Sequence, residues 1–192
     1  LRGRLLAGVE FHYGQVIIQP LEEQPVNELF VRDEERENAL LKVFDECGFT
    51  KTDGGFYMQN DELEYNFLMH VLPSLQKQMK VYATTAVRFR LAKNTVFPRI
   101  RVKKHSERTN WVEFTFELDG IRDAELQQVL RALQLKQECY RLPDGMLLSL
   151  ETREMEEIQR FLKAVPIQDD GYEASFDLPI TESLKFLELF ED

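Results

Sequence analysis

Apolar side chains recur at helical spacing in several stretches of the chain. The clearest is 32–49, where an acidic first turn precedes one apolar face and Gly48 stands just past the helix end. The same spacing predicts helices at 60–75, 122–137, 152–165 and 181–190. Asn60 and Thr152 have side chains suited to cap two of these helices. Pro73 should bend or end the first of the two.

Other stretches have the composition or the alternation of strands. The segment 10–20 is rich in β-branched and aromatic residues, and a short strand should follow the Gly-rich turn at 53–55. Apolar and polar residues alternate strictly in three consecutive segments, 86–91, 99–104 and 110–118. A further strand is expected near 172–179.

A well-specified turn lies in 138–151, which reads ECYRLPDGMLLSLE. Pro143 presets φ, Asp144 can bond the backbone ahead, and Gly145 accepts the left-handed conformation that returns the chain as a second strand. The buried side should then carry Tyr140, Leu142, Leu148 and Leu150. A catalytic role for Asp144 would need a nearby base, nucleophile or metal, and the sequence offers none.

The two halves of the chain share the order strand, helix, hairpin, helix, strand. Arg32 precedes Asp53 by 21 residues, and Arg122 precedes Asp144 by 22. We therefore expect an α+β fold with mixed or antiparallel sheets and flanking helices, arranged as two pseudo-repeated βαββαβ lobes unless the shared order is coincidence. The expected division is an N-terminal α+β lobe at 1–85, then central basic strands and a C-terminal α+β lobe at 86–192. One continuous domain is the alternative.

Charge is distributed unevenly along the 192 residues. The formal net charge is −10, which argues against a polyanionic partner. Between Arg88 and Arg108, however, eight basic residues stand against one acid, so this stretch carries +7 and the remainder −17. Such asymmetry is typical of a local binding surface.

Strand alternation would gather the basic residues on one sheet face, opposite an apolar face. Neighbouring like charges repel, which favours an anionic partner such as DNA phosphate. The candidate nucleic-acid-binding residues are Arg88, Arg90, Arg99, Arg101, Lys103 and Lys104. The alternative is internal neutralisation by Glu113 and Glu117, with Glu113 pairing with Arg101 or Lys103. Trp111 should cover this face or lie against the Arg side chains.

Several kinds of chemistry lack their sequence motifs. There is no G-x-x-x-x-G-K-[S/T] phosphate loop and no G-x-S-x-G, and the three histidines lack ligand spacing. The Asp-Glu pairs at 33–34, 45–46 and 61–62 fall on predicted helices, where solvent or the helix dipole accounts for them. We therefore expect no catalysis, no cofactor and no metal in this segment.

Cysteine use and hydropathy indicate the compartment. Cys47 and Cys139 lie far apart, without C-x-x-C spacing, which indicates buried thiols in a reducing environment. No apolar run approaches the roughly 20 residues that span a bilayer. We expect a cytoplasmic protein and, because the chain begins at Leu1, a segment of a longer polypeptide.

The stretch 116–151 resembles the helicase-associated domain of bacterial Swi/Snf-family proteins. The resemblance rests on Gly120-Ile121, a Leu-rich helix, a Tyr-x-Leu-x-Asp-Gly hairpin and a following Leu-x-Leu-Glu. Upstream segments fit too, so it extends over about 10–165. In that family the domain precedes a two-lobed ATP-driven DNA translocase and often follows a SWIM-type zinc-binding module.

The resemblance implies a non-catalytic accessory domain of a bacterial Swi/Snf-type helicase or translocase, which positions DNA or regulates the motor. Its expected partners are DNA, bound weakly, and the ATPase lobes of the same polypeptide. An alternative is a protein-interaction module with an acidic docking surface and no DNA contact. A third hypothesis, a freestanding enzyme, requires a pocket where ionisable groups with perturbed pKa values converge.

Overall fold

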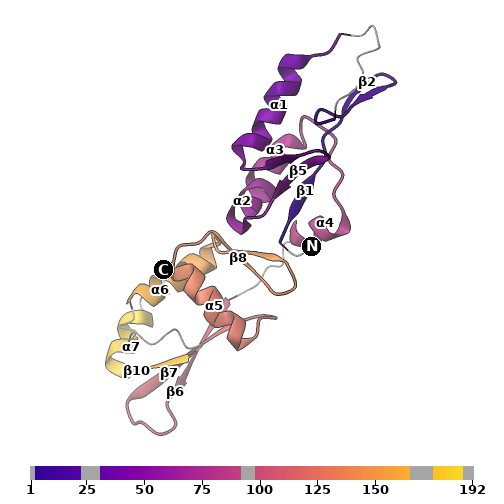
Figure 1. The fold of residues 1–192 in the computed structure, drawn as a ribbon. Helices are drawn as coiled ribbons and strands as arrows, with labels where there is room; N and C mark the ends of the chain where they lie inside the picture. The colour runs from indigo at the N-terminus through magenta and orange to yellow at the C-terminus, as the bar shows by residue number, and fades with distance from the viewer. Residues whose placement is uncertain (1–2, 23–30, 92–97, 165–174, 188–192) are drawn as a thin grey trace. The chain divides into compact units, whose positions relative to one another are not determined.

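The fold is α+β, as predicted, and every strand pair in it is antiparallel (Figure 1). The computed structural model describes residues 3–22, 31–91, 98–164 and 175–187. The chain divides into two compact units, an N-terminal unit of Leu1–Leu91 and a C-terminal unit of Ala92–Asp192.

Two small sheets form in the N-terminal unit. One has the strand order β1-β5-β4, and the other pairs β2 with β3. The bounds are β1 Leu5–Ala7, β2 Phe11–Tyr13, β3 Val16–Ile18, β4 Thr50–Thr52 and β5 Gly55–Met58. The prediction of a single strand at 10–20 was therefore wrong. Gly14 has φ of +63°, a conformation that suits glycine, and the turn there folds the segment into a hairpin.

The helices of the N-terminal unit are α1 Glu34–Glu46, α2 Asp61–Asn66, α3 Leu72–Leu75 and α4 Thr85–Leu91, with a π-helical turn, η1, at Phe67–Val71. The predicted helix at 60–75 is confirmed, and Asn60 Oδ1 accepts a hydrogen bond from Leu63 N at 3.0 Å. The irregularity predicted at Pro73 takes the form of η1, which ends at Val71, two residues before it. A proline ring clashes with the carbonyl four residues earlier in a regular α-helix, and widening the turn relieves that conflict.

Residues 86–91, predicted as a strand, form helix α4 instead. Thr84 begins the helix, because its carbonyl accepts from Arg88 N at 2.9 Å and its Oγ1 accepts from Val87 N at 3.4 Å. The helix is under two turns long, so its apolar residues alternate by chance as they would in a strand.

Aromatic rings form the centre of the N-terminal core. Phe44 of α1 stacks on Phe56 of β5 with ring centroids 4.8 Å apart, and Phe49 meets Phe67 edge to face at 4.8 Å. The start of α1 is fixed by Glu37, whose buried carboxylate accepts hydrogen bonds from Arg32 and from Tyr13. The bond from Arg32, more than that from Tyr13, lowers the pKa of Glu37.

The described residues of the C-terminal unit form a three-stranded sheet, a separate hairpin and three helices. The sheet has the order β10-β7-β6, and the hairpin pairs β8 with β9. The bounds are β6 Pro98–Lys104, β7 Trp111–Leu118, α5 Asp123–Gln134, β8 Cys139–Arg141, β9 Leu147–Ser149, α6 Arg153–Ala164, β10 Ser175–Pro179 and α7 Ile180–Leu187. The strand predicted near 172–179 and the helix predicted at 181–190 are thus present, but 172–174 and 188–190 lie outside the described residues.

The core of this unit lies between the sheet and helices α5 and α6 (Figure 1). Phe114 and Phe116 of β7 and Phe176 of β10 surround Phe161 of α6, with ring centroids 5.4 to 5.6 Å from it. Helix α6 begins as predicted, because Thr152 Oγ1 accepts from Met155 N at 3.3 Å. One face of the sheet is therefore buried, and the exposed residues Arg99, Arg101 and Lys103 lie on the other.

The two pseudo-repeated lobes are not confirmed. In the N-terminal unit the β4–β5 hairpin joins the sheet with β1, whereas in the C-terminal unit the β8–β9 hairpin forms a sheet of its own. The helix starts are also out of register. Asp33 caps α1 by accepting from Arg36 N, whereas Arg122 occupies the cap position of α5 and Asp123 is already helical.

The turn at 142–145 has the predicted chemistry. Gly145 N donates to Leu142 O at 2.8 Å, Asp144 Oδ1 accepts from Met146 N at 2.9 Å, and Gly145 has φ of +94°. Leu142, Leu148 and Leu150 are buried, and Tyr140 is half-buried. The turn is thus a structural element that sets the hairpin.

We expect Gly145→Val to destabilise the C-terminal unit by about 1 to 2 kcal/mol, because a β-branched residue is strained at positive φ. A Cβ at this position would meet nothing within 4 Å, so the cost is one of backbone conformation and not of a clash. Thermal unfolding followed by circular dichroism measures it. Gly145→Asn is the control, because Asn tolerates positive φ and should lose less. Equal melting midpoints for both variants would contradict this reading of the turn.

Candidate functional site

The exposed face of the C-terminal sheet carries the basic residues of β6. Arg99, Arg101 and Lys103 lie opposite Glu117, Thr115 and Glu113 of β7, and all three are exposed. Ile100 and Val102 point to the other face, as the alternation predicted. Lys104 lies opposite Val112 and therefore belongs to the apolar side of the sheet, at its end.

Acidic side chains engage two of these cations. Arg101 Nε lies 2.9 Å from Glu117 Oε2, and Arg99 donates to Asp119 Oδ2 at 3.2 Å. Neutralisation by Glu113 and Glu117 was one of the two alternatives, and the pair with Glu117 agrees with it, whereas the pairing of Glu113 with Arg101 or Lys103 does not form among the described residues. The register instead places Thr115 opposite Arg101, so Arg101 reaches diagonally to Glu117. Exposed pairs of this kind contribute only about 0.2 to 1 kcal/mol, so an incoming phosphate can compete with them.

The end of β6 and the turn that joins it to β7 carry a group of cations, which we call the hairpin tip: Lys103 and Lys104 of the strand and Arg108 of the turn. Among the residues that the structure describes, none of the three has an acidic side chain within ion-pair distance. Arg108 lies over the ring of Trp111, with 5.1 Å from Cζ to the ring centroid. Trp111 was expected to lie against an arginine, but Arg108 was not among the predicted site residues.

His105 organises this turn. Its Nδ1 accepts hydrogen bonds from the backbone N–H groups of Glu107 and Arg108, both at 3.1 Å. Its Nε2 lies 3.1 Å from Asp177 Oδ2 of β10, and its backbone N donates to Trp111 O at 3.0 Å. The side chain thus acts as a local scaffold, a role that a search for metal-ligand spacing does not detect.

Arg88 and Arg90 do not join this face, because they lie on α4 in the N-terminal unit. Arg90 donates to Glu64 Oε1 at 2.7 Å and to Arg4 O at 3.1 Å. The side chain of Glu64 is 0% exposed and that of Arg90 12%, so the pair is buried. Arg88 is exposed, and its Nε donates to Ala83 O at 3.0 Å. The prediction that strand alternation places Arg88 and Arg90 on one sheet face with the basic residues of β6 was therefore wrong.

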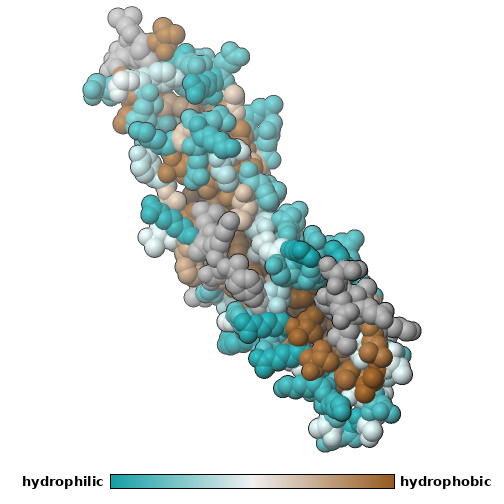
Figure 2. Space-filling model, turned by 180° about the vertical axis from the view of Figure 1, so that it is seen from behind, coloured by the Kyte–Doolittle hydropathy of each residue, from teal (hydrophilic) through white to brown (hydrophobic). Residues whose placement is uncertain are grey.

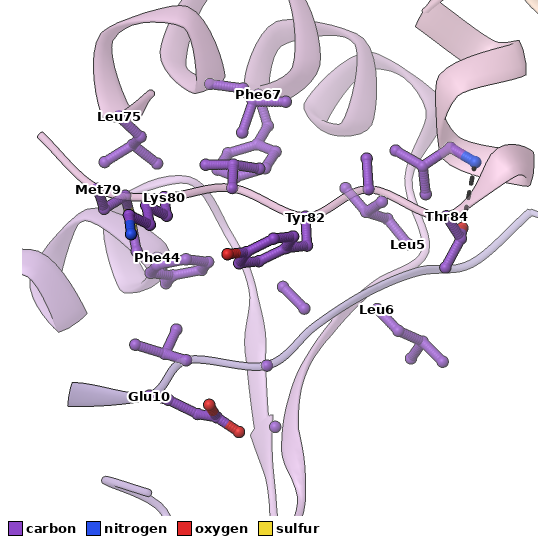
Figure 3. Close-up of a pocket in the computed structure, with 18 of the residues that line it drawn as sticks. Leu5, Leu6, Glu10, Phe44, Phe67, Leu75, Met79, Lys80, Tyr82 and Thr84 are labelled. Carbon is purple, nitrogen blue, oxygen red and sulfur yellow. Dashed lines mark hydrogen bonds between the residues drawn. The ribbon is translucent and has the colours of Figure 1, made fainter. Parts of the chain in front are cut away.

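The N-terminal unit contains a groove of about 1170 Å³. Its walls are mainly apolar and include Leu5, Val9, Phe44, Phe67, Leu72 and Leu75. Figure 3 shows Tyr82 on the segment that crosses this groove, which Phe44 and Phe67 also line. Tyr82 is 88% exposed and Leu6 63%. Figure 2 shows hydrophobic side chains at the surface of both units, among hydrophilic ones.

The described residues contain few reactive groups outside these surfaces. They include no group of three or more histidine, cysteine or acidic side chains placed to hold a metal. No helix in the described ranges is long and apolar enough to cross a membrane. Cys139 is buried as predicted, whereas Cys47 is only partly buried, and neither forms a disulfide. Desolvation, with a smaller effect of Glu46, raises the pKa of the Cys47 thiol.

Comparison with known proteins identifies a family. No curated protein and no solved structure matches the chain. The family described as bacterial SNF2 helicase associated matches residues 1–192, the whole chain. This match confirms the resemblance seen over about 10–165 and extends it to the whole chain. The chain belongs to the bacterial SNF2 helicase associated family.

Proposed function

We propose that this chain is a non-catalytic accessory domain of a bacterial SNF2-type ATP-driven DNA motor, and that it contacts DNA and helps to position it. The observation that carries the proposal is strand β6, where four of seven residues are basic and all four are exposed. Arg99, Arg101 and Lys103 form a row on one face of the strand, and such a row suits the regularly spaced phosphates of a nucleic acid. The helicase-associated family supports the link to a motor. The same proposal assigns the protein to the cytoplasm.

The charge of the whole chain sets the expected strength of binding. A net charge of −10 repels a polyanion, while β6 attracts it locally. We therefore propose that the isolated domain binds DNA weakly, and that tight binding requires the ATPase lobes of the same polypeptide. In that arrangement the domain adjusts where DNA lies on the motor.

Salt dependence tests the DNA contact. Binding of a fluorescent DNA duplex is measured at several salt concentrations for the wild-type chain and for a β6 variant, Arg99→Gln, Arg101→Gln, Lys103→Gln and Lys104→Gln together. The logarithm of the affinity should fall linearly with the logarithm of salt concentration, with a slope of about −0.9 for each phosphate neutralised on duplex DNA. The β6 variant should show a shallower slope.

The matched control removes four exposed cations from the N-terminal unit, as Arg36→Gln, Lys42→Gln, Lys51→Gln and Lys77→Gln. Its net charge changes as much as that of the β6 variant, so it measures the effect of net charge alone. No salt-dependent binding by the wild-type chain, or equal slopes for the two variants, would defeat the proposal.

The groove of the N-terminal unit favours a second candidate function, docking of a protein. An exposed Tyr82 and Leu6 beside apolar walls resemble the composition of a protein interface, where aromatic side chains are enriched. An interaction module of this kind would bind its partner with little dependence on salt. Salt dependence of binding therefore separates the two functions.

A further inference from the structure

We infer that the hairpin tip, Lys103, Lys104 and Arg108, is the point at which this domain contacts the phosphates of duplex DNA, and that Arg99 and Arg101 are not. This inference rests on the proposed function and makes it specific to one end of β6. It also brings in Arg108, which lies in the turn and outside the alternating strand pattern.

The first argument is the availability of charge. Arg99 and Arg101 already have carboxylates at 3.2 and 2.9 Å, so a phosphate must displace those carboxylates before it gains either cation. The three tip residues have no such partner among the described residues. A phosphate that meets them displaces only water and counterions, which is the favourable event in binding DNA. The net gain per cation is therefore larger at the tip.

The second argument is the rigidity of the tip. Because Nδ1 of His105 accepts two backbone N–H bonds, the hydrogen of the neutral ring lies on Nε2, which donates to Asp177. The hydrogen bond from Nε2 to Asp177 holds the imidazole ring in place. The two hydrogen bonds that Nδ1 accepts then fix the backbone of the turn at Glu107 and Arg108. The guanidinium of Arg108 also lies over the ring of Trp111, which limits its movement. A cation held in place before binding loses less conformational entropy on meeting a phosphate.

The acidic groups near the tip indicate which residues matter most. Glu113 is the cross-strand neighbour of Lys103 on the exposed face, and Glu107 lies in the turn itself. Lys104 is on the opposite face from Glu113, and Arg108 is held over Trp111. Lys104 and Arg108 are therefore the pair whose charge is least opposed.

The experiment compares two double variants with the same net charge, Lys104→Gln with Arg108→Gln, and Arg99→Gln with Arg101→Gln. Binding of a fluorescent duplex is measured over a salt series with the 192-residue chain. The tip variant should have a slope shallower than wild type by about 1.8, the value for two phosphates. The Arg99 and Arg101 variant should keep nearly the wild-type slope.

The outcomes separate the inference from the proposed function. If the wild-type chain shows no salt-dependent binding, the proposed function fails and the inference with it. If the wild-type chain binds but the two variants lose slope equally, or the Arg99 and Arg101 variant loses more, the inference is wrong and the proposed function stands. Lys104→Arg with Arg108→Lys keeps both charges and should keep the wild-type slope. Loss of slope in that variant, too, would overturn the inference.

Discussion

Replacing Arg90 by Ala is expected to lower the free energy of unfolding of the N-terminal unit by about 3 to 5 kcal/mol, the cost of breaking a buried ion pair by removing one partner. The side chain of Glu64 is 0% exposed, and its Oε1 accepts from Arg90 at 2.7 Å. Without the guanidinium of Arg90, the buried Glu64 carboxylate loses this partner of opposite charge and stays shielded from water. The substitution also removes the hydrogen bond from Arg90 to Arg4 O.

The measurement is hydrogen exchange of peptides from Leu1–Leu91, which reports the stability of that unit separately from the other. Arg88→Ala is the matched control, because Arg88 lies two residues away on the same helix and is exposed. It should change stability by no more than about 0.5 kcal/mol. Adding Glu64→Gln to Arg90→Ala should restore part of the loss, because it removes the buried charge. Similar protection in the Arg88 and Arg90 variants would show that the pair does not stabilise the unit.

Phe161→Ala should destabilise the C-terminal unit by about 3 to 5 kcal/mol, the usual cost of deleting a large aromatic side chain from a core. Phe161 lies among Phe114 and Phe116 of β7 and Phe176 of β10, which are neighbouring strands of one sheet. Its removal leaves a cavity that these rings cannot fill, since β7 is held on both sides by strand pairing.

Trp111, the one tryptophan in the sequence, lies in the same unit, so denaturant unfolding followed by its fluorescence measures this loss. Leu135→Ala is the control, because Leu135 is exposed and should cost little. A loss for Phe161→Ala no larger than that for Leu135→Ala would mean that the aromatic cluster is not the core of the unit.

The long periodic elements could be predicted from the sequence. Helices such as α1, α5 and α6 span three turns or more, so the spacing of their apolar residues identifies them. The short elements could not. Residues 86–91 alternate like a strand but form a helix, because so short a segment fits both periods and Thr84 provides the start. Residues 10–20 form a hairpin because one Gly-centred turn outweighs the β-branched composition.

The candidate site could be predicted only in part. The alternating pattern correctly predicted that Arg99, Arg101 and Lys103 lie on one face of β6 and its apolar residues on the other. The partners of the cations depend on strand register and on contacts between distant residues, which alternation does not determine. Glu117 was among the two predicted acids, but the register decides that it, and not Glu113, pairs with Arg101. Glu64, which pairs with Arg90, is 26 residues away in sequence and was not predicted. Arg108 was missed because its position depends on the turn built around His105.

Strand β6 is also an edge, since among the described strands it pairs with β7 alone. An edge strand presents unpaired backbone donors and acceptors that can recruit a second copy of the same chain. Two antiparallel copies of β6 centred on Arg101 would bring Arg99 of one beside Lys103 of the other, and like charges directly opposite are repelled. The basic residues of β6 would therefore oppose self-association, and neutralising them should raise the tendency to aggregate whether or not DNA is present.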